Sequence, residues 1–248
     1  MGVIDLATGE TLAFIEASVP NGSRRILEIG CGAGELAAAL VNRGYEVVAL
    51  DSHRDAVKAA RAKGVRAIQA CWPDWDDDPF DVVLFTRSLH HIHDLRRSVA
   101  RAAALLREDG VLIVEDFAFA DATPWAAAWF QRELRMLDEA PRLDRKRDTF
   151  GASLLASEDP MAAWHQDHGH DLHTASAMAA ALAHTFESVR EAKAPYLYRY
   201  LLQMVADDAL GSRLVSLFLA QEKALAERLE DFAIGRRWLA RKPKKQST

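Results

Sequence analysis

Short apolar runs alternate with amphipathic stretches along the first half of the chain. The runs are rich in Val, Ile and Leu, as strands covered on both faces are. They predict strands over residues 25–29, 46–50, 65–70, 81–86 and 110–119. The stretches between them predict helices over residues 34–43, 54–63 and 95–106. Strands that alternate with helices in this way indicate βαβ units, and therefore a parallel sheet with right-handed crossovers.

The second half of the chain is less regular. Its periodicity predicts helices over residues 124–137, 174–184, 198–206 and 212–231, and two more strands over residues 187–194 and 236–240. The stretch from Asp144 to His173 is charged and then histidine-rich, and no helix or strand is predicted there. With neither a repeat nor a dividing linker, residues 1–248 are predicted to form one α/β domain. Its expected core is a Rossmann-like, seven-stranded, mostly parallel sheet flanked by helices, with a helical cap inserted at about residues 120–172.

Composition limits the kinds of partner. The chain has 248 residues, half of them hydrophobic, and 31 basic against 36 acidic side chains give a net charge of −5. This balance argues against a general nucleic-acid or anionic-membrane binder, which needs a basic field. Cys31 and Cys71 fit neither a disulfide framework nor a zinc spacing. Residues 1–20 do not resemble a signal peptide, and no apolar run approaches the roughly 18 residues of a membrane span. We therefore expect a cytoplasmic protein without membrane or nucleic-acid partners; the oligomeric state stays open.

The segment ILEIGCGAGEL, residues 26–36, carries the strongest chemical signal. A predicted strand ends, glycines follow at alternate positions, and a helix begins. Glycine permits positive φ and a close approach of backbone to a ligand, and the helix N-terminus offers unpaired N–H groups. Asp51 ends the next strand, where a carboxylate can accept both hydroxyls of a ribose. The combination predicts a site for an adenosine-containing cofactor.

The register of the glycines distinguishes two cofactor families. A dinucleotide fingerprint, G-x-G-x-x-G, needs glycine at position 35, where this chain has Glu35. The pattern here is E-x-G-x-G-x-G, with Glu28 two residues before Gly30. It resembles motif I of class I methyltransferases that use S-adenosylmethionine (SAM), in particular the type 11/12-like enzymes of small molecules. The resemblance covers roughly residues 25–119 and is weaker through the last strand.

Three further segments resemble the same family, in the same order. They are ACWPD at residues 70–74, FDVVLFTRSLHHI at residues 80–92 and LLREDGVLIV at residues 105–114. In the last, Glu108 and Asp109 replace the family's usual Pro-Gly, a departure that concerns the geometry of a turn. Trp72 can equally be a core residue. Each match alone is weak, but four in order are specific.

The resemblance implies SAM as the cofactor and S-adenosylhomocysteine (SAH) as its product. In the family, the glycines contact the methionine and ribose moieties, the acid after the second strand holds the ribose, and the third- and fourth-strand loops contact the adenine and the sulfonium. Carried over to this chain, the implied cofactor-binding residues are Glu28, Gly30, Cys31, Gly32, Gly34, Asp51, Ser52, Cys71, Trp72, Thr86, Arg87 and Leu89.

Methyl transfer is an in-line displacement, so the protein must align the nucleophile and exclude water. A general base is needed only for an acceptor that arrives protonated. The Asn/Asp-Pro-Pro-Tyr motif of nucleic-acid enzymes does not follow the fourth strand, and Cys71 lacks the Pro-Cys arrangement of a cytosine-attacking thiolate. We therefore expect a small-molecule acceptor, methylated at O or N. A catalytically silent SAM-binding module stays open, and Glu35 disfavours an NAD(P)-dependent oxidoreductase.

Histidines and carboxylates supply the candidate catalytic groups. His91 or His90 can act as a general base, since imidazole titrates near neutrality, or both can simply orient their loop. Glu115 and its neighbour Asp116 end the fifth strand at the carboxyl edge, where either can meet the acceptor.

A second histidine cluster comprises His165, His168, His170 and His173. It fits a metal site, a cap segment at the acceptor or a structural turn. Our prediction includes no metal. The face with Trp125 and Trp129 is expected to belong to the core or to contact an acceptor.

Overall fold

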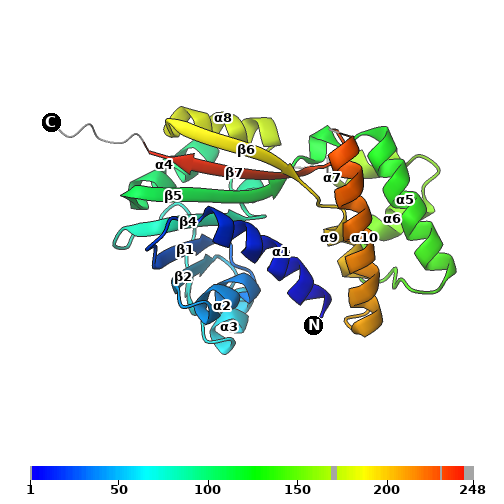
Figure 1. The fold of residues 1–248 in the computed structure, drawn as a ribbon, viewed down its shortest axis with the longest axis horizontal. Coiled ribbons are helices and arrows are strands. Elements are labelled where there is room, and N and C mark those ends of the chain that lie inside the picture. The colour runs from blue at the N-terminus through cyan, green and yellow to red at the C-terminus, as the bar shows by residue number, and fades with distance from the viewer. Residues whose placement is uncertain (1, 169–171, 230, 243–248) are drawn as a thin grey trace. The chain divides into compact units, whose positions relative to one another are not determined.

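The computed structural model describes residues 2–168, 172–229 and 231–242. Its centre is a seven-stranded sheet with the order β3-β2-β1-β4-β5-β7-β6 (Figure 1). The strands are β1 (Arg25–Ile29), β2 (Glu46–Asp51), β3 (Arg66–Gln69), β4 (Phe80–Thr86), β5 (Leu106–Phe117), β6 (Ser188–Ala194) and β7 (Gly235–Arg241). The pairs β1–β2, β2–β3, β1–β4 and β4–β5 are parallel, and the sheet as a whole is mixed. The predicted Rossmann-like, mostly parallel sheet is confirmed.

The register of the central strands brings their carboxyl ends to one edge of the sheet. Ile29 at the end of β1 pairs with Leu50 on one side and with Phe85 on the other. Thr86, which ends β4, pairs with Glu115 of β5. The loops after β1, β2 and β4 therefore start side by side, which is where open α/β sheets bind ligands.

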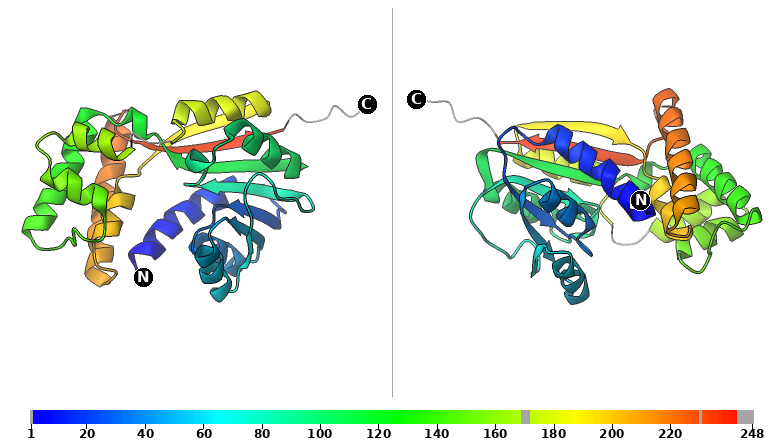
Figure 2. Two further views of the ribbon diagram at one scale, coloured as in Figure 1. Left: turned by 180° about the vertical axis from the view of Figure 1, so that it is seen from behind. Right: turned by 60° about the horizontal axis from the view of Figure 1, so that its bottom comes forward.

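Helices cover both faces of the sheet, and further helices form the rest of the structure. They are α1 (Val3–Ser18), α2 (Glu35–Asn42), α3 (Arg54–Ala62), α4 (Leu95–Leu105), α5 (Pro124–Glu139), α6 (Thr149–Ala156), α7 (Pro160–His168), α8 (Ala175–Thr185), α9 (Tyr198–Met204) and α10 (Ala209–Arg228), with 3-10 turns η1 (Leu89–His91) and η2 (Phe119–Asp121). Helices α2 and α3 pack with the second half of α1 on one face of the sheet, and α4 and α8 lie together on the other (Figure 2). No helix among the described residues is long and apolar enough to span a membrane.

Two sequence predictions about secondary structure were wrong. The stretch from Asp144 to His173 contains α6 and α7, because Phe150 and Trp164 are buried and stabilise helices with little periodicity of their own. Asp148 begins α6 by accepting the N–H of Gly151 at 2.6 Å. Strand β5 begins at Leu106 and not at residue 110, with a shift of register between the pairs Phe80–Leu106 and Val82–Val111.

The chain divides into two compact units. The larger comprises residues 8–116, 173–192 and 236 onward, and holds the sheet. The smaller comprises residues 117–172 and 193–235 with the start of α1, and its core is rich in buried aromatic side chains such as Phe130, Trp164 and Tyr198. The segment predicted as a cap, residues 120–172, lies in the smaller unit. That it is an insertion within one domain stays a prediction.

Candidate active site

A cavity of about 830 Å³ lies at the carboxyl edge of the sheet, within the larger unit. Four loops surround it, those that follow β1, β2, β3 and β4. The lining residues are Ile29, Gly30, Gly32, residues 50–53, residues 70–73, Arg87, Ser88, residues 91–94 and Arg97. Seven of the residues expected to bind the cofactor are among them: Gly30, Gly32, Asp51, Ser52, Cys71, Trp72 and Arg87.

The three glycines of the first loop all have positive φ but differ in their surroundings. A Cβ on Gly30 would come within 2.5 Å of the Ser88 Cβ, and one on Gly34 within 2.6 Å of the Ala60 Cβ. At Gly32 a Cβ would meet nothing within 4 Å. Gly30 and Gly34 therefore allow close packing inside the protein, whereas Gly32 leaves open space for a ligand beside the backbone.

Asp51 is fixed at the cavity by two backbone donors. Its Oδ2 accepts the N–H of Gly32 at 2.9 Å, and its Oδ1 accepts the N–H of His53 at 2.9 Å. An ionised carboxylate has about four acceptor positions, so each oxygen can take another hydrogen bond. The carboxylate is thus oriented beside the open glycine and suited to a pair of hydroxyl donors, such as those of a ribose.

Glu28 lies directly before the cavity lining, and its side chain is buried. Its Oε1 accepts the hydroxyl of Thr86 at 3.1 Å, while its Oε2 has no hydrogen-bond partner among the described residues. Burial raises the pKa of Glu28 to about 7, against the opposing effects of the Thr86 hydrogen bond and the Arg87 charge. A buried acceptor left unsatisfied costs free energy, so this oxygen suits a cationic donor from a ligand.

The loop after β4 begins with a backbone conformation that is uncommon outside glycine. Arg87 has a φ of 60°, and its N–H donates to the Glu115 carbonyl at 2.7 Å. Its guanidinium lies 3.4 Å from the hydroxyl of Thr11. The next residue, Ser88, donates its hydroxyl to the Ile29 carbonyl at 2.6 Å, which ties this loop to the glycine loop.

The adjacent histidines His90 and His91 occupy different environments. His90 is buried, and its Nδ1 lies 2.6 Å from Oδ1 of Asp116. His91 lines the cavity, and its ring centroid lies 4.0 Å from that of His90. Burial lowers the pKa of His91 and the neighbouring His90 lowers it further, although Asp116 opposes both. A lowered pKa favours the neutral imidazole, the form that can accept a proton.

Several residues named from the sequence lie outside the lining. Besides Glu28, they are Cys31, Gly34, Thr86, Leu89 and His90. Burial raises the pKa of the Cys31 thiol to about 12, which keeps it in the unreactive thiol form. Glu115 is buried outside this cavity, where it accepts the Thr11 hydroxyl at 3.3 Å and lies 3.7 Å from the Arg237 guanidinium. Its role as a catalytic group stays a prediction.

Ten residues of the lining were not predicted from the sequence. These ten are Ile29, Leu50, His53, Ala70, Pro73, Ser88, Ile92, His93, Asp94 and Arg97. Most are direct neighbours of the predicted residues, so the four motifs indicate them once whole loops are considered. Arg97 is the exception, because it reaches the cavity from α4.

The second histidine cluster does not form one site. His168 is buried, with Nε2 at 2.7 Å from the hydroxyl of Tyr200. His173 lies 2.8 Å from the Ile92 carbonyl through its Nε2, and His165 is exposed. His170 lies outside the described residues. Among the residues that the structure describes, no three His, Cys, Asp or Glu side chains are grouped so as to hold a metal.

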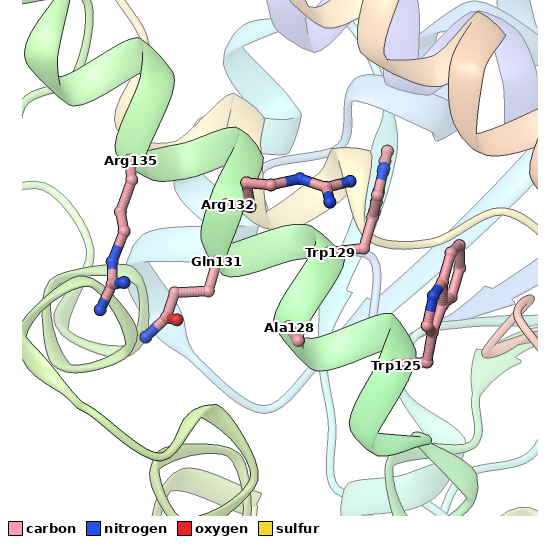
Figure 3. A pocket seen from close by; sticks show the side chains of 6 residues that line it. All are labelled: Trp125, Ala128, Trp129, Gln131, Arg132 and Arg135. Carbon is pink, nitrogen blue, oxygen red and sulfur yellow. The ribbon is translucent and has the colours of Figure 1, made fainter.

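A second cavity, of about 400 Å³, lies along α5 in the smaller unit (Figure 3). Trp125 and Trp129 line one end, while Gln131 and Arg135 extend from the other side of the helix. Trp129 is a core residue packed on Phe218, whereas Trp125 is 47% exposed. The polar lining groups are amides and guanidinium ions, which do not exchange protons near neutral pH, so this cavity has no candidate general base.

Comparison with known proteins agrees with the geometry of the larger cavity. A family model described as a methyltransferase domain matches residues 7–185, which is most of the chain. The chain belongs to this family. This is the family of class I, SAM-dependent methyltransferases, whose cofactor is SAM.

Curated relatives share part of this methyltransferase. The uncharacterized methyltransferase YcgJ of Bacillus subtilis is 31% identical over 167 residues, covering 62% of this chain and 66% of the relative. The uncharacterized methyltransferase Mb0092 of Mycobacterium bovis is 32% identical, covering 42% and 56%. The ubiquinone biosynthesis O-methyltransferase of Xylella fastidiosa is also 32% identical, covering 42% and 46%. The chain thus spans about half to two thirds of the length of these relatives.

Solved structures share the fold. A SAM-dependent methyltransferase from Archaeoglobus fulgidus has a TM-score of 0.57 at 14% identity, covering 96% of this chain and 94% of that one. The plantazolicin methyltransferase BpumL in complex with SAH has a TM-score of 0.54 at 12% identity, covering 96% and 83%.

Proposed function

We propose that the methyltransferase transfers the methyl group of SAM to an oxygen or nitrogen atom of a small-molecule acceptor by in-line displacement. The observation that carries this proposal is the pairing of Asp51 with the open backbone of Gly32 at the cavity. One carboxylate oxygen fixes the loop, and both oxygens can still accept hydroxyl donors.

We propose that SAM is held at its two polar ends by residues of the cavity and by Glu28, which directly precedes the lining residue Ile29. Asp51 accepts the ribose hydroxyls, and Ser52, Cys71 and Trp72 lie on the adenine side. At the other end, Glu28 and Arg87 carry the opposite charges that match the ammonium and carboxylate groups of an amino acid. The Oε2 of Glu28 has no hydrogen-bond partner in the described part of the chain, which supports this assignment, since an ammonium would satisfy it.

SAM supplies an electrophilic methyl group on a positively charged sulfur. The role of the protein is to hold the acceptor in line with that methyl group, to exclude water and to take a proton where the acceptor carries one. We assign the last role to His91, because its imidazole lines the cavity and its lowered pKa favours the neutral form. His90 contributes to this role, because its ring lies next to that of His91 and lowers the pKa of His91.

We propose a small-molecule acceptor on three grounds. The net charge of −5 does not favour a polyanion, and the motifs of nucleic-acid methyltransferases do not follow β4. One relative bears the name of an O-methyltransferase. The same charge argument underlies our expectation that the enzyme has no nucleic-acid or membrane partner.

Calorimetry with SAM, SAH, NAD and NADP, followed by a panel of phenol, amine and carboxylate acceptors, tests the proposal. We expect SAM and SAH alone to bind, and mass spectrometry to detect a methylated acceptor that His91→Ala no longer produces. Binding of NAD or NADP alone would overturn the cofactor assignment. Tight SAH binding without transfer to any acceptor would instead indicate a silent SAM-binding module.

A further inference from the structure

The loop between β4 and α4 is held at His90 by residues from two other elements. Asp116, in β5, accepts the His90 N–H at 3.3 Å through Oδ2 and lies 2.6 Å from the His90 ring through Oδ1. His173, directly before α8, donates its N–H to the His90 carbonyl at 2.9 Å. Its Nε2 lies 2.8 Å from the carbonyl of Ile92. Hydrogen bonds at His90 and at the Ile92 carbonyl therefore hold the backbone on both sides of His91, which lines the cavity.

The ring of His173 is not required to begin α8. Thr174 caps this helix, since its hydroxyl accepts the N–H of Ala177 at 3.2 Å. Because a carbonyl oxygen can only accept, the contact with Ile92 requires a proton on Nε2 of His173. The side chain therefore makes a specific hydrogen bond to the site loop that the helix itself does not need.

Both holding residues lie where the chain passes between the two units. Asp116 is the last residue of the larger unit before the chain continues at Phe117, and His173 is the first after Leu172. Both residues belong to the larger unit, as does the loop that carries His91.

We propose that Asp116 and His173 are positioning residues that fix the loop from His90 to Ile92, so that the His91 imidazole faces the cofactor cavity. The functional meaning of this placement rests on the proposed role of His91. The placement itself can be measured without an acceptor or a cofactor.

The test compares His173→Ala with His173→Gln and with His184→Ala, an exposed histidine at the other end of α8. In His173→Ala the loop loses one anchor, so we expect the pKa of His91 to rise toward its ordinary value in an NMR titration of the imidazoles. We also expect SAH to bind about threefold to tenfold more weakly, the fold-change of one lost hydrogen bond. Gln should restore both properties through its side-chain N–H, and His184→Ala should change neither.

If His173 had a purely structural role, its replacement by Ala would lower only the melting temperature. A folded His173→Ala protein with the wild-type titration of His91 and wild-type SAH affinity would overturn the proposal.

If neither His173 variant folds, amide hydrogen exchange in the wild-type chain tests the proposal instead. Protected amides at His90 and His173 would support the proposal, and exchange at the rate of an unfolded chain would refute it. Failure of the wild-type protein to bind SAH would contradict the proposed function, while the His91 titration would still report on the positioning.

Discussion

Two buried glutamates, one in each unit, have the same raised pKa but different surroundings. Burial raises the pKa of both Glu28 and Glu222 to about 7. Glu222, on α10, accepts three backbone N–H groups at the start of α9, from Tyr196, Leu197 and Tyr198 at 2.6–3.0 Å. Glu28 accepts one hydroxyl, and its second oxygen has no hydrogen-bond partner among the described residues.

The difference shows that a raised pKa does not by itself mark a functional site. The hydrogen bonds of Glu222 join two helices inside the smaller unit, which explains why a carboxylate is buried there. The Oε2 of Glu28 has no hydrogen-bond partner among the described residues, and Glu28 directly precedes Ile29, the first residue of the cavity lining. Satisfaction of hydrogen bonds, and not burial, therefore separates the two glutamates, and the predictions below test this separation.

The largest expected effect lies at the cavity, where we propose that the carboxylate of Asp51 holds the cofactor. We expect Asp51→Ala to weaken SAH binding by about 100-fold or more, because two hydrogen bonds to a charged acceptor are lost at about 1.5–3 kcal/mol each. Isothermal titration calorimetry measures the change, with Asp55→Ala on the exposed face of α3 as the matched control. An unchanged affinity in folded Asp51→Ala protein would show that this carboxylate does not hold the cofactor.

Glu222→Gln should destabilise the protein without affecting the cofactor site. The amide oxygen can still accept two of the three N–H groups, but the amide nitrogen faces the third donor, so about 1–3 kcal/mol of unfolding free energy should be lost. Urea denaturation measures the loss, and SAH affinity should stay within twofold, about 0.4 kcal/mol. Wild-type stability would show that the three hydrogen bonds do not explain this buried carboxylate.

Glu28→Gln should produce the opposite pair of results. Replacing the carboxylate removes its charge from the ammonium of the ligand, so SAH should bind about tenfold more weakly. The folded-state pKa of Glu28 lies above the unfolded value of 4.5. Ionisation of Glu28 therefore lowers the stability of the native protein as pH rises above 4.5. Stability at pH 8 should therefore be equal or higher in Glu28→Gln. A variant that loses stability but keeps wild-type affinity would place Glu28 with Glu222 as a structural group.

The smallest expected effect is a dependence of cofactor affinity on pH. Because the pKa of Glu28 is raised to about 7, its carboxyl group is mostly protonated at pH 6 and mostly ionised at pH 8. SAH affinity should therefore increase several-fold, up to about tenfold, as pH rises through 7. Calorimetry at several pH values tests this, and Glu28→Gln should flatten the profile. The same slope in both proteins would assign it to another group.

Local patterns predicted most of the sheet and the cofactor motifs. The strands β1, β2 and β4 are mainly apolar runs, which can be recognised from neighbouring residues alone. Helices α6 and α7 could not be predicted in this way, because their formation depends on the burial of Phe150 and Trp164 by distant aromatic residues. Alternation along β5 indicates that Glu115 and Asp116 face opposite sides, but it does not say which one meets the loop that carries His90.

The sequence by itself determined the family and the cofactor, because the glycine register, Glu28 and Asp51 lie within a few residues of the strand ends whose geometry they need. Only the tertiary structure decided the roles within the loop after β4. His91 lines the cavity while His90 is buried against Asp116, and His173 reaches the same loop from a segment more than 80 residues further along the chain. Contacts between such distant residues are fixed by the packing of the whole sheet, which no local pattern records.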